Sequence, residues 1–194
     1  MNKMKRERAA LMAIAMVLVG LSEGTGQAAP IDDGTVVGVD FGAVAPSNNF
    51  NQVNSGSGSI AAGSVIDTNN VIVDGVGVLW VAGGVNNDAS VESEVPGQPA
   101  VFDDTNLTDW LIAINSGNGG RITLTFTGLD DTRAYDLLIG AAHPTADADC
   151  TWTASGQSGT IDCSVGENAF VTLTNLVTDG SGNLYIASLG VDPR

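Results

Sequence analysis

The chain has 194 residues, of which 22 are acidic and 7 are basic, so its formal net charge at pH 7 is −15. Four of the basic residues lie within the first eight positions, which leaves the remainder almost without cations. Binding to nucleic acid or to an anionic membrane surface requires lysine and arginine to neutralise phosphates. The composition therefore excludes both as partners of the main part of the chain.

The first 28 residues are predicted to be a signal peptide. Four basic residues between Lys3 and Arg8 form a positive region, and residues 9–21 form an apolar segment too short to span a bilayer. Residues 26–28 resemble the small-x-small pattern that precedes a cleavage site. We therefore expect an exported protein, secreted or held at the cell surface. An uncleaved N-terminal membrane anchor is the alternative.

Residues 29–194 are predicted to form a single domain. This segment of 166 residues contains 20 acidic and 3 basic side chains and no lysine. A chain of this size can bury one self-sufficient core but not comfortably two. Its acidity is compatible with divalent cations, with a saline habitat or simply with solubility.

Alternation of apolar and polar residues with a period of two dominates this domain, and most of the chain's 25 glycines lie in it and interrupt the alternation. The clearest case is residues 121–127, where Ile122, Leu124 and Phe126 alternate with threonines. The predicted strands are residues 35–41, 71–73, 76–81, 109–115, 121–127, 135–142, 150–154, 160–163, 169–176 and 184–191. Because each strand has one apolar face to bury, we expect an all-β fold, an antiparallel β-sandwich of jelly-roll type.

Two polar stretches, residues 48–64 and 83–99, interrupt the strand pattern and are rich in Ser, Gly and Asn. They are predicted to be long surface loops. Loops of this length are uncommon unless they bind a ligand or are disordered. We therefore expect a ligand site to be built on these loops.

Cys150 and Cys163 are the two cysteines of the chain, and in an exported protein such a pair is expected to form a disulfide. A two-residue turn at residues 156–157 would place the cysteines opposite each other, with Trp152 facing Ile161. In the chain-entropy treatment, closing a loop of this length contributes about 3 kcal/mol to stability.

Several segments, in this order, resemble one group of bacterial proteins. They are residues 39–42 (VDFG), 83–87 (GGVNN), 124–130 (LTFTGLD) leading into Tyr135, and 182–186 (GNLYI). The group consists of exported galactose-binding-like jelly-roll domains, many of them in proteins that carry a PEP-CTERM sorting tail, which is absent from this sequence. The resemblance implies non-catalytic binding of carbohydrate or surface polymer, and it transfers no catalytic residue.

Calcium is the metal that the sequence suggests, because this ion prefers oxygen ligands clustered in a loop. The candidate ligands are Asp103, Asp104, Asn106 and Asp109. Two further clusters are Asp130, Asp131 and Asp136, and Asp179, Ser181 and Asn183. None of the three matches a complete EF-hand loop. The competing interpretation is turn chemistry, in which Asp and Asn side chains cap their own backbone.

Sugar binding uses an aromatic face for the apolar side of the ring and a few polar groups for its hydroxyls. Trp110, which follows Asp109 at the start of a predicted strand, is the best candidate, although burial in the core is the competing interpretation. The other two tryptophans, Trp80 and Trp152, are expected in the core.

Arg121 and Arg133 stand out because the domain contains so few cations. Each is expected either to pair with a neighbouring acid or to bind an anionic sugar. No catalytic residue is assigned, because the single His143 lies next to Pro144 in a predicted loop and no nucleophile elbow accompanies it.

The sequence thus predicts a secreted, non-catalytic domain whose partner is an extracellular polysaccharide or glycan, with calcium as its one candidate cofactor. The alternative is a structural or adhesive protein of a surface or matrix, which associates with itself or with other surface proteins through strand edges and calcium. Exposed aromatic side chains would favour the first function, and an unprotected edge strand would favour the second. A secreted hydrolase is the third hypothesis.

Overall fold

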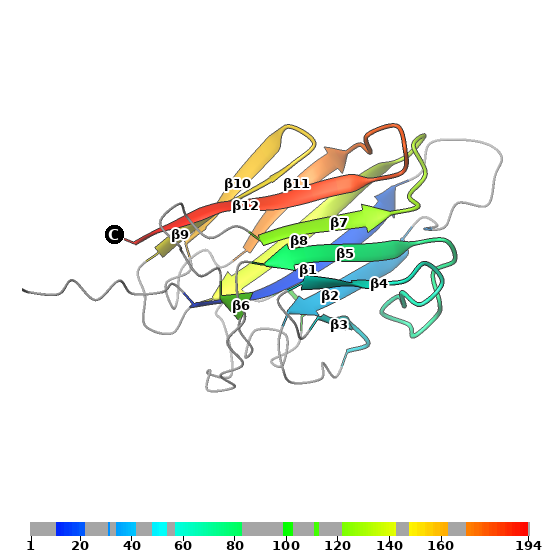
Figure 1. Cartoon of the computed structure of the whole chain (residues 1–194), viewed down its shortest axis with the longest axis horizontal. Coiled ribbons are helices and arrows are strands. Elements are labelled where there is room, and N and C mark those ends of the chain that lie inside the picture. The colour runs from blue at the N-terminus through cyan, green and yellow to red at the C-terminus, as the bar shows by residue number, and fades with distance from the viewer. Residues whose placement is uncertain are drawn as a thin grey trace, which may run out of the picture.

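The computed structural model describes residues 11–21, 31, 34–41, 48–53, 57–82, 99–102, 111–112, 122–142, 148–162 and 170–193. In this part of the chain, two β-sheets pack face to face, as Figure 1 shows. No helix of the length and apolar character needed to cross a membrane occurs in these ranges. The predicted all-β sandwich is confirmed.

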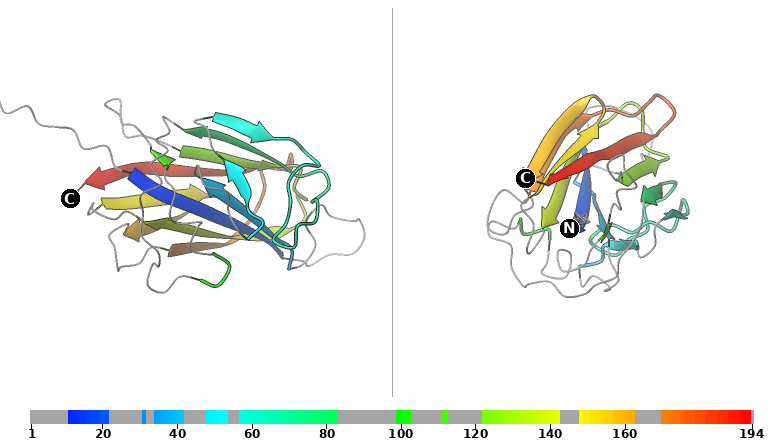
Figure 2. Two further views of the ribbon diagram at one scale, coloured as in Figure 1. Left: turned by 90° about the horizontal axis from the view of Figure 1, so that it is seen from below. Right: turned by 60° about the vertical axis from the view of Figure 1, so that its left-hand side comes forward.

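The strands are β1 (Leu11–Leu21), β2 (Val36–Phe41), β3 (Asn51–Val53), β4 (Ser57–Ile60), β5 (Gly77–Ala82), β6 (Leu111–Ile112), β7 (Ile122–Thr127), β8 (Ala134–Ala142), β9 (Ala148–Ala154), β10 (Gln157–Asp162), β11 (Phe170–Leu176) and β12 (Leu184–Pro193). The first sheet has the order β11-β8-β1-β2-β3, and β6 pairs with the start of β1. The second sheet has the order β10-β9-β12-β7-β5-β4. The pairings are antiparallel except that of β2 with β3, which is parallel. Figure 2 shows the two layers from two further sides.

The alternation that predicts β7 determines which side chains enter the core. Ile122, Leu124 and Phe126 are fully buried between the sheets, while the threonines between them point outward. Neighbouring strands follow the same rule, because residues opposite each other in a ladder lie on the same face. The largest fully buried side chains include Trp152, Tyr135, Phe41, Phe126, Met16 and Leu18.

A second, smaller apolar cluster covers the outer face of the first sheet. Val17, Phe50 and Phe102 are buried there, and the ring of Phe102 lies 6.0 Å from that of Phe50 and 5.6 Å from that of Phe170. Gly38 makes room for this cluster, since a Cβ at that position would come within 2.3 Å of the Phe50 ring. The first sheet is therefore covered on both faces.

Strand β1 lies inside the predicted signal peptide. It pairs with β2 over six residues and with β8 over nine, and Met16 and Leu18 are fully buried between the sheets. A continuous apolar run is typical both of a leader and of a strand buried on two faces. The signal peptide stays a prediction, and the structure adds that the same segment can complete the sheet.

The predicted loop at residues 48–64 is wrong for much of its length. It contains β3 and β4, and Asn51 is buried with its side-chain amide donating to the carbonyls of Gly38 and Ile66. The predicted strand at residues 71–73 is instead part of a single bridge between Ile66 and Ile72. Most of the other predicted loop, residues 83–98, lies outside the described residues.

The turn between β9 and β10 differs from the predicted one. Ser155 and Gly156 form it, with φ values of 47° and 77°, so both central residues are left-handed as a type I′ hairpin requires. Cys150 consequently lies opposite Ile161, and Trp152 lies opposite Gly159. The register argument that placed the two cysteines opposite each other is therefore wrong. The described residues include no disulfide and Cys163 lies outside them, so the disulfide itself stays a prediction.

Candidate functional site

One end of the sandwich carries a cavity of about 320 Å³. It lies where the β9–β10 turn, the β11–β12 loop and the start of β12 meet. The lining residues are Ser155, Val177, Thr178, Asp179, Asn183 and Tyr185. These side chains combine one aromatic ring, one carboxylate, one amide and two aliphatic hydroxyls in a small space.

Tyr185 is the aromatic side chain of the cavity. Its neighbours Leu184 and Ile186 are buried in the core, so the alternation along β12 places Tyr185 on the outer face, where it is 58% exposed. Its hydroxyl is near enough to the carboxylate of Asp179 to contribute, as the smallest of several causes, to the lowered pKa of that group. The ring thus lies beside this carboxylate while much of its surface remains open to solvent.

Asp179 organises the loop before β12. Its Oδ1 accepts hydrogen bonds from the backbone N–H of Ser181 at 2.8 Å and of Asn183 at 3.1 Å, and its Oδ2 accepts one from Asn183 Nδ2 at 3.0 Å. The hydrogen bond from the Asn183 side chain, followed by that from the Ser181 backbone, lowers the pKa of Asp179 below its ordinary value. The carboxylate is therefore ionised at neutral pH and fixed in direction.

Hydrogen bonds to Asp131 of the β7–β8 turn hold this loop in place. Asp131 Oδ1 accepts a hydrogen bond from the backbone N–H of Gly182 at 2.8 Å and another from Thr178 Oγ1. Gly182 has a φ of 74°, and a Cβ there would lie 2.8 Å from the carbonyl oxygen of Leu129. On the other side, the hydroxyl of Ser155 donates to the carbonyl of Val177. The cavity is therefore bounded by segments that are hydrogen-bonded to one another.

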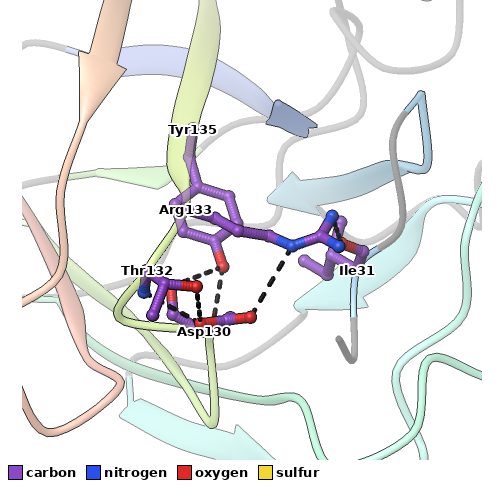
Figure 3. Close-up of polar contacts among 5 residues, drawn as sticks. All are labelled: Ile31, Asp130, Thr132, Arg133 and Tyr135. Carbon is purple, nitrogen blue, oxygen red and sulfur yellow. Dashed lines mark hydrogen bonds and ion pairs between the residues drawn. The ribbon is translucent and has the colours of Figure 1, made fainter. Parts of the chain in front are cut away.

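Arg133 and Tyr135 form a separate cluster that fastens the β7–β8 turn, shown in Figure 3. Arg133 donates from Nη1 to the carbonyl oxygen of Ile31 at 3.0 Å, and its Nε lies 3.6 Å from Asp130 Oδ2. The hydroxyl of Tyr135 accepts from the N–H of Asp130 at 2.9 Å. The pairing of Arg133 with Asp130 is one of the two roles that the sequence predicts for this arginine. The other role, binding of an anionic sugar, stays a prediction.

Within this cluster, the pKa of Asp130 is lowered and the pKa of Tyr135 is raised. The side-chain hydrogen bond from Thr132 lowers the pKa of Asp130, and the charge of Arg133 acts in the same direction. Burial raises the pKa of Tyr135, because the anionic phenolate would lose its hydration. Asp130 is thus ionised and Tyr135 neutral across the physiological range, as a structural clamp requires.

The aspartates of the two described acidic clusters accept hydrogen bonds from within the protein. Besides Asp130, Asp131 and Asp179, Asp136 accepts a hydrogen bond from the backbone N–H of Asn175 at 2.9 Å. Within the described ranges, no three His, Cys, Asp or Glu side chains are grouped so that they could hold a metal ion. Asp130 and Asp179 cap their own turns, as the competing interpretation predicts, whereas Asp131 and Asp136 join segments that are distant in the sequence. Calcium binding stays a prediction.

Many predicted site residues cannot be placed, because they lie outside the described part of the chain. They are Asp103, Asp104, Asn106, Asp109, Trp110, Arg121 and Cys163. The expectation for the remaining tryptophans is confirmed, since Trp80 and Trp152 both belong to the core. Tyr185 was not among the predicted site residues, although the apolar residues on either side of it were a usable signal.

The sequence matches no protein-family model and no characterised protein, and the fold matches no solved structure. The proposed function therefore depends on the cavity, on the surface around it and on the features of the sequence.

Proposed function

We propose that this protein is an exported, non-catalytic glycan-binding domain of galactose-binding-like type, and that the cavity beside Tyr185 is its binding site. The observation that carries the proposal is an exposed tyrosine ring that lines one cavity together with an oriented carboxylate and amide. Sugar sites combine an aromatic surface for the C–H face of a pyranose with a few fixed polar groups for its hydroxyls.

The polar side chains of the cavity suit hydroxyl ligands. A carboxylate oxygen has more than one lone pair, so Asp179 can accept a sugar hydroxyl in addition to its hydrogen bonds within the loop. Ser155 and Thr178 can also accept through their hydroxyl oxygens. Val177, 56% exposed, extends the apolar surface beside the Tyr185 ring. Because these groups are already ordered, little conformational entropy is lost when a ligand binds.

The composition of the cavity supports binding rather than hydrolysis. Glycoside hydrolysis in most families uses two carboxyl groups on opposite sides of the scissile bond. Asp179 is the single acidic side chain among the six cavity-lining residues, and none of the six is a histidine or a cysteine. The lowered pKa of Asp179 also makes it unsuited to act as a general acid near neutral pH.

The test is retention of residues 29–194 and of the full-length chain on a panel of polysaccharides and glycans, in calcium and again in chelator. We expect specific retention by the wild-type protein, loss of at least about tenfold in affinity for Tyr185→Ala, and partial recovery in Tyr185→Phe, which keeps the ring. Val71→Ala is the matched control, because Val71 is also 58% exposed but does not line the cavity.

The two readouts separate binding from folding. Truncation of an exposed side chain should change the melting temperature little, so a Tyr185→Ala variant that neither binds nor melts normally would indicate a structural role. Absence of retention on every glycan by a folded wild-type protein would refute the proposal. Loss of retention in chelator would place calcium in the site.

A further inference from the structure

The outer face of the second sheet is uncharged along most of its length: strand register places acidic residues there at one end, where Asp149 of β9 lies opposite Asp162 of β10 and Asp192 of β12. Strand alternation and register identify the other members of this face, and we call the part that they form the neutral face. They are Ser57, Ser59, Leu79, Val81, Thr123, Thr125, Thr127, Thr151, Thr153, Ser158, Thr160, Tyr185 and Ala187. Nine of these thirteen residues are Thr or Ser, and the others are apolar or aromatic.

Such a face is unexpected in this chain. With 22 acidic residues, outward positions on a solvated sheet are the places where charges would cost least and would help solubility most. Instead Leu79 is 47% exposed and Val81 is 59% exposed, and both lie on β5, between β7 and the edge strand β4. Exposed apolar residues that adjoin one another commonly mark a contact surface.

The neutral face is continuous with the cavity through Tyr185. In the ladders, Tyr185 lies opposite Thr125, Thr125 lies opposite Leu79, and Leu79 lies opposite Ser59. Successive strands are about 4.8 Å apart, so the row from Tyr185 to Leu79 is about 10 Å long. A parallel row runs from Ala187 through Thr123 to Val81.

We propose that the neutral face binds an uncharged polysaccharide that runs across the strands from Tyr185 over Thr125 to Leu79. The proposal rests on the proposed function, because both share Tyr185. Threonine and serine hydroxyls can donate and accept hydrogen bonds with sugar hydroxyls, and Leu79 and Val81 cover C–H surfaces of the sugar rings. An anionic polymer would be repelled by the net charge of −15 and would meet no cation on this face among its described side chains.

The experiment compares a neutral soluble β-glucan and a neutral galactan with alginate as the anionic polymer, using affinity electrophoresis and isothermal titration. We expect the full-length chain to bind a neutral polymer with an affinity that changes less than about twofold between 50 and 500 mM salt, since no ion pair is involved. Thr125→Glu and Leu79→Glu should each weaken binding at least about tenfold. Thr172→Glu is the control, because Thr172 is exposed on β11 of the other sheet.

Four results would overturn the proposal. Absence of binding to any glycan would refute it together with the proposed function. Binding that depends on Tyr185 but is unchanged in Thr125→Glu and Leu79→Glu would refute it alone and confine the ligand to the cavity. Preference for alginate would also refute it alone. A dimer in light scattering that Leu79→Glu dissociates would identify the neutral face as a contact between two copies of the chain.

Discussion

Gly128, directly after β7, provides a stringent test of the packing described above. Its φ is 74°, and a Cβ at this position would lie 2.0 Å from the carbonyl oxygen of Gly75. Gly156 in the β9–β10 turn has nearly the same φ, 77°, but no atom lies within 4 Å of its would-be Cβ. The two glycines therefore share the conformational requirement and differ in steric surroundings.

Substitution of each glycine by alanine separates these two effects. The left-handed conformation costs an alanine about 1–2 kcal/mol, which should be the whole effect of Gly156→Ala. Gly128→Ala adds a backbone displacement, for which overpacking costs of about 1–3 kcal/mol are typical, so we expect a total of about 2–5 kcal/mol. With about 2–4 °C per kcal/mol for a domain of this size, the melting temperature should fall by about 5 °C in the first variant and about 10 °C in the second.

Urea unfolding followed by tryptophan fluorescence gives the free energies directly, and differential scanning calorimetry gives the melting temperatures. Equal losses of stability in Gly128→Ala and Gly156→Ala would contradict the close approach of Gly75 and Gly128. A larger loss in Gly156→Ala would contradict the assigned hairpin as well.

Three further outcomes are expected. Asp131→Ala removes the hydrogen bond that the Gly182 N–H donates, so it should release the loop before β12 without exposing any buried apolar side chain. We expect glycan binding to weaken several-fold and the melting temperature to fall by only a few degrees. Unchanged affinity would show that this hydrogen bond is not needed to hold the loop. Because the pKa of Asp179 is lowered, its carboxylate is ionised at pH values above the ordinary value of 3.8 and is protonated only as pH falls through the lower folded-state value. The hydrogen bonds that this carboxylate accepts are lost only on protonation, so glycan affinity should be constant from pH 7 to 5 and should decline only in stronger acid. A midpoint near pH 6 would implicate another group. If Cys150 and Cys163 form the predicted disulfide, reductant should lower the melting temperature of the wild-type protein and leave that of Cys150→Ser unchanged, whereas identical melting with and without reductant in the wild-type protein would remove the disulfide.

The strands that the sequence predicts well are those whose pattern is dictated by burial. In β7, Ile122, Leu124 and Phe126 alternate with threonines, and the pattern matches the core face. The short strands β3 and β4 were missed because Ser, Gly and Asn are typical of loops. There, pairing to β2 and β5 and the buried amide of Asn51 determine the structure, and neither has a local signal.

The site shows the same division between local and long-range information. The outward position of Tyr185 follows from its buried neighbours Leu184 and Ile186. The cavity, by contrast, depends on the bond between Asp131 and Gly182, which lie 51 residues apart. The turn at Ser155 was missed because a serine with positive φ is uncommon, and only the requirement of a type I′ hairpin selects it.

If residues 1–28 are a signal peptide, as the sequence predicts, the position of β1 links the folding of the precursor to its processing. Since β1 runs antiparallel to both β2 and β8, those two strands run parallel to each other, two strand spacings or about 10 Å apart. A precursor that folds first hides its apolar leader in the middle of a sheet, where a peptidase or an export machinery cannot reach it. A precursor that is cleaved first leaves β2 and β8 with unpaired backbone along a gap wide enough for one strand. For a chain processed in the predicted way, the order of folding and cleavage would therefore decide whether the mature domain has a closed sheet or a slot that can accept a strand from elsewhere.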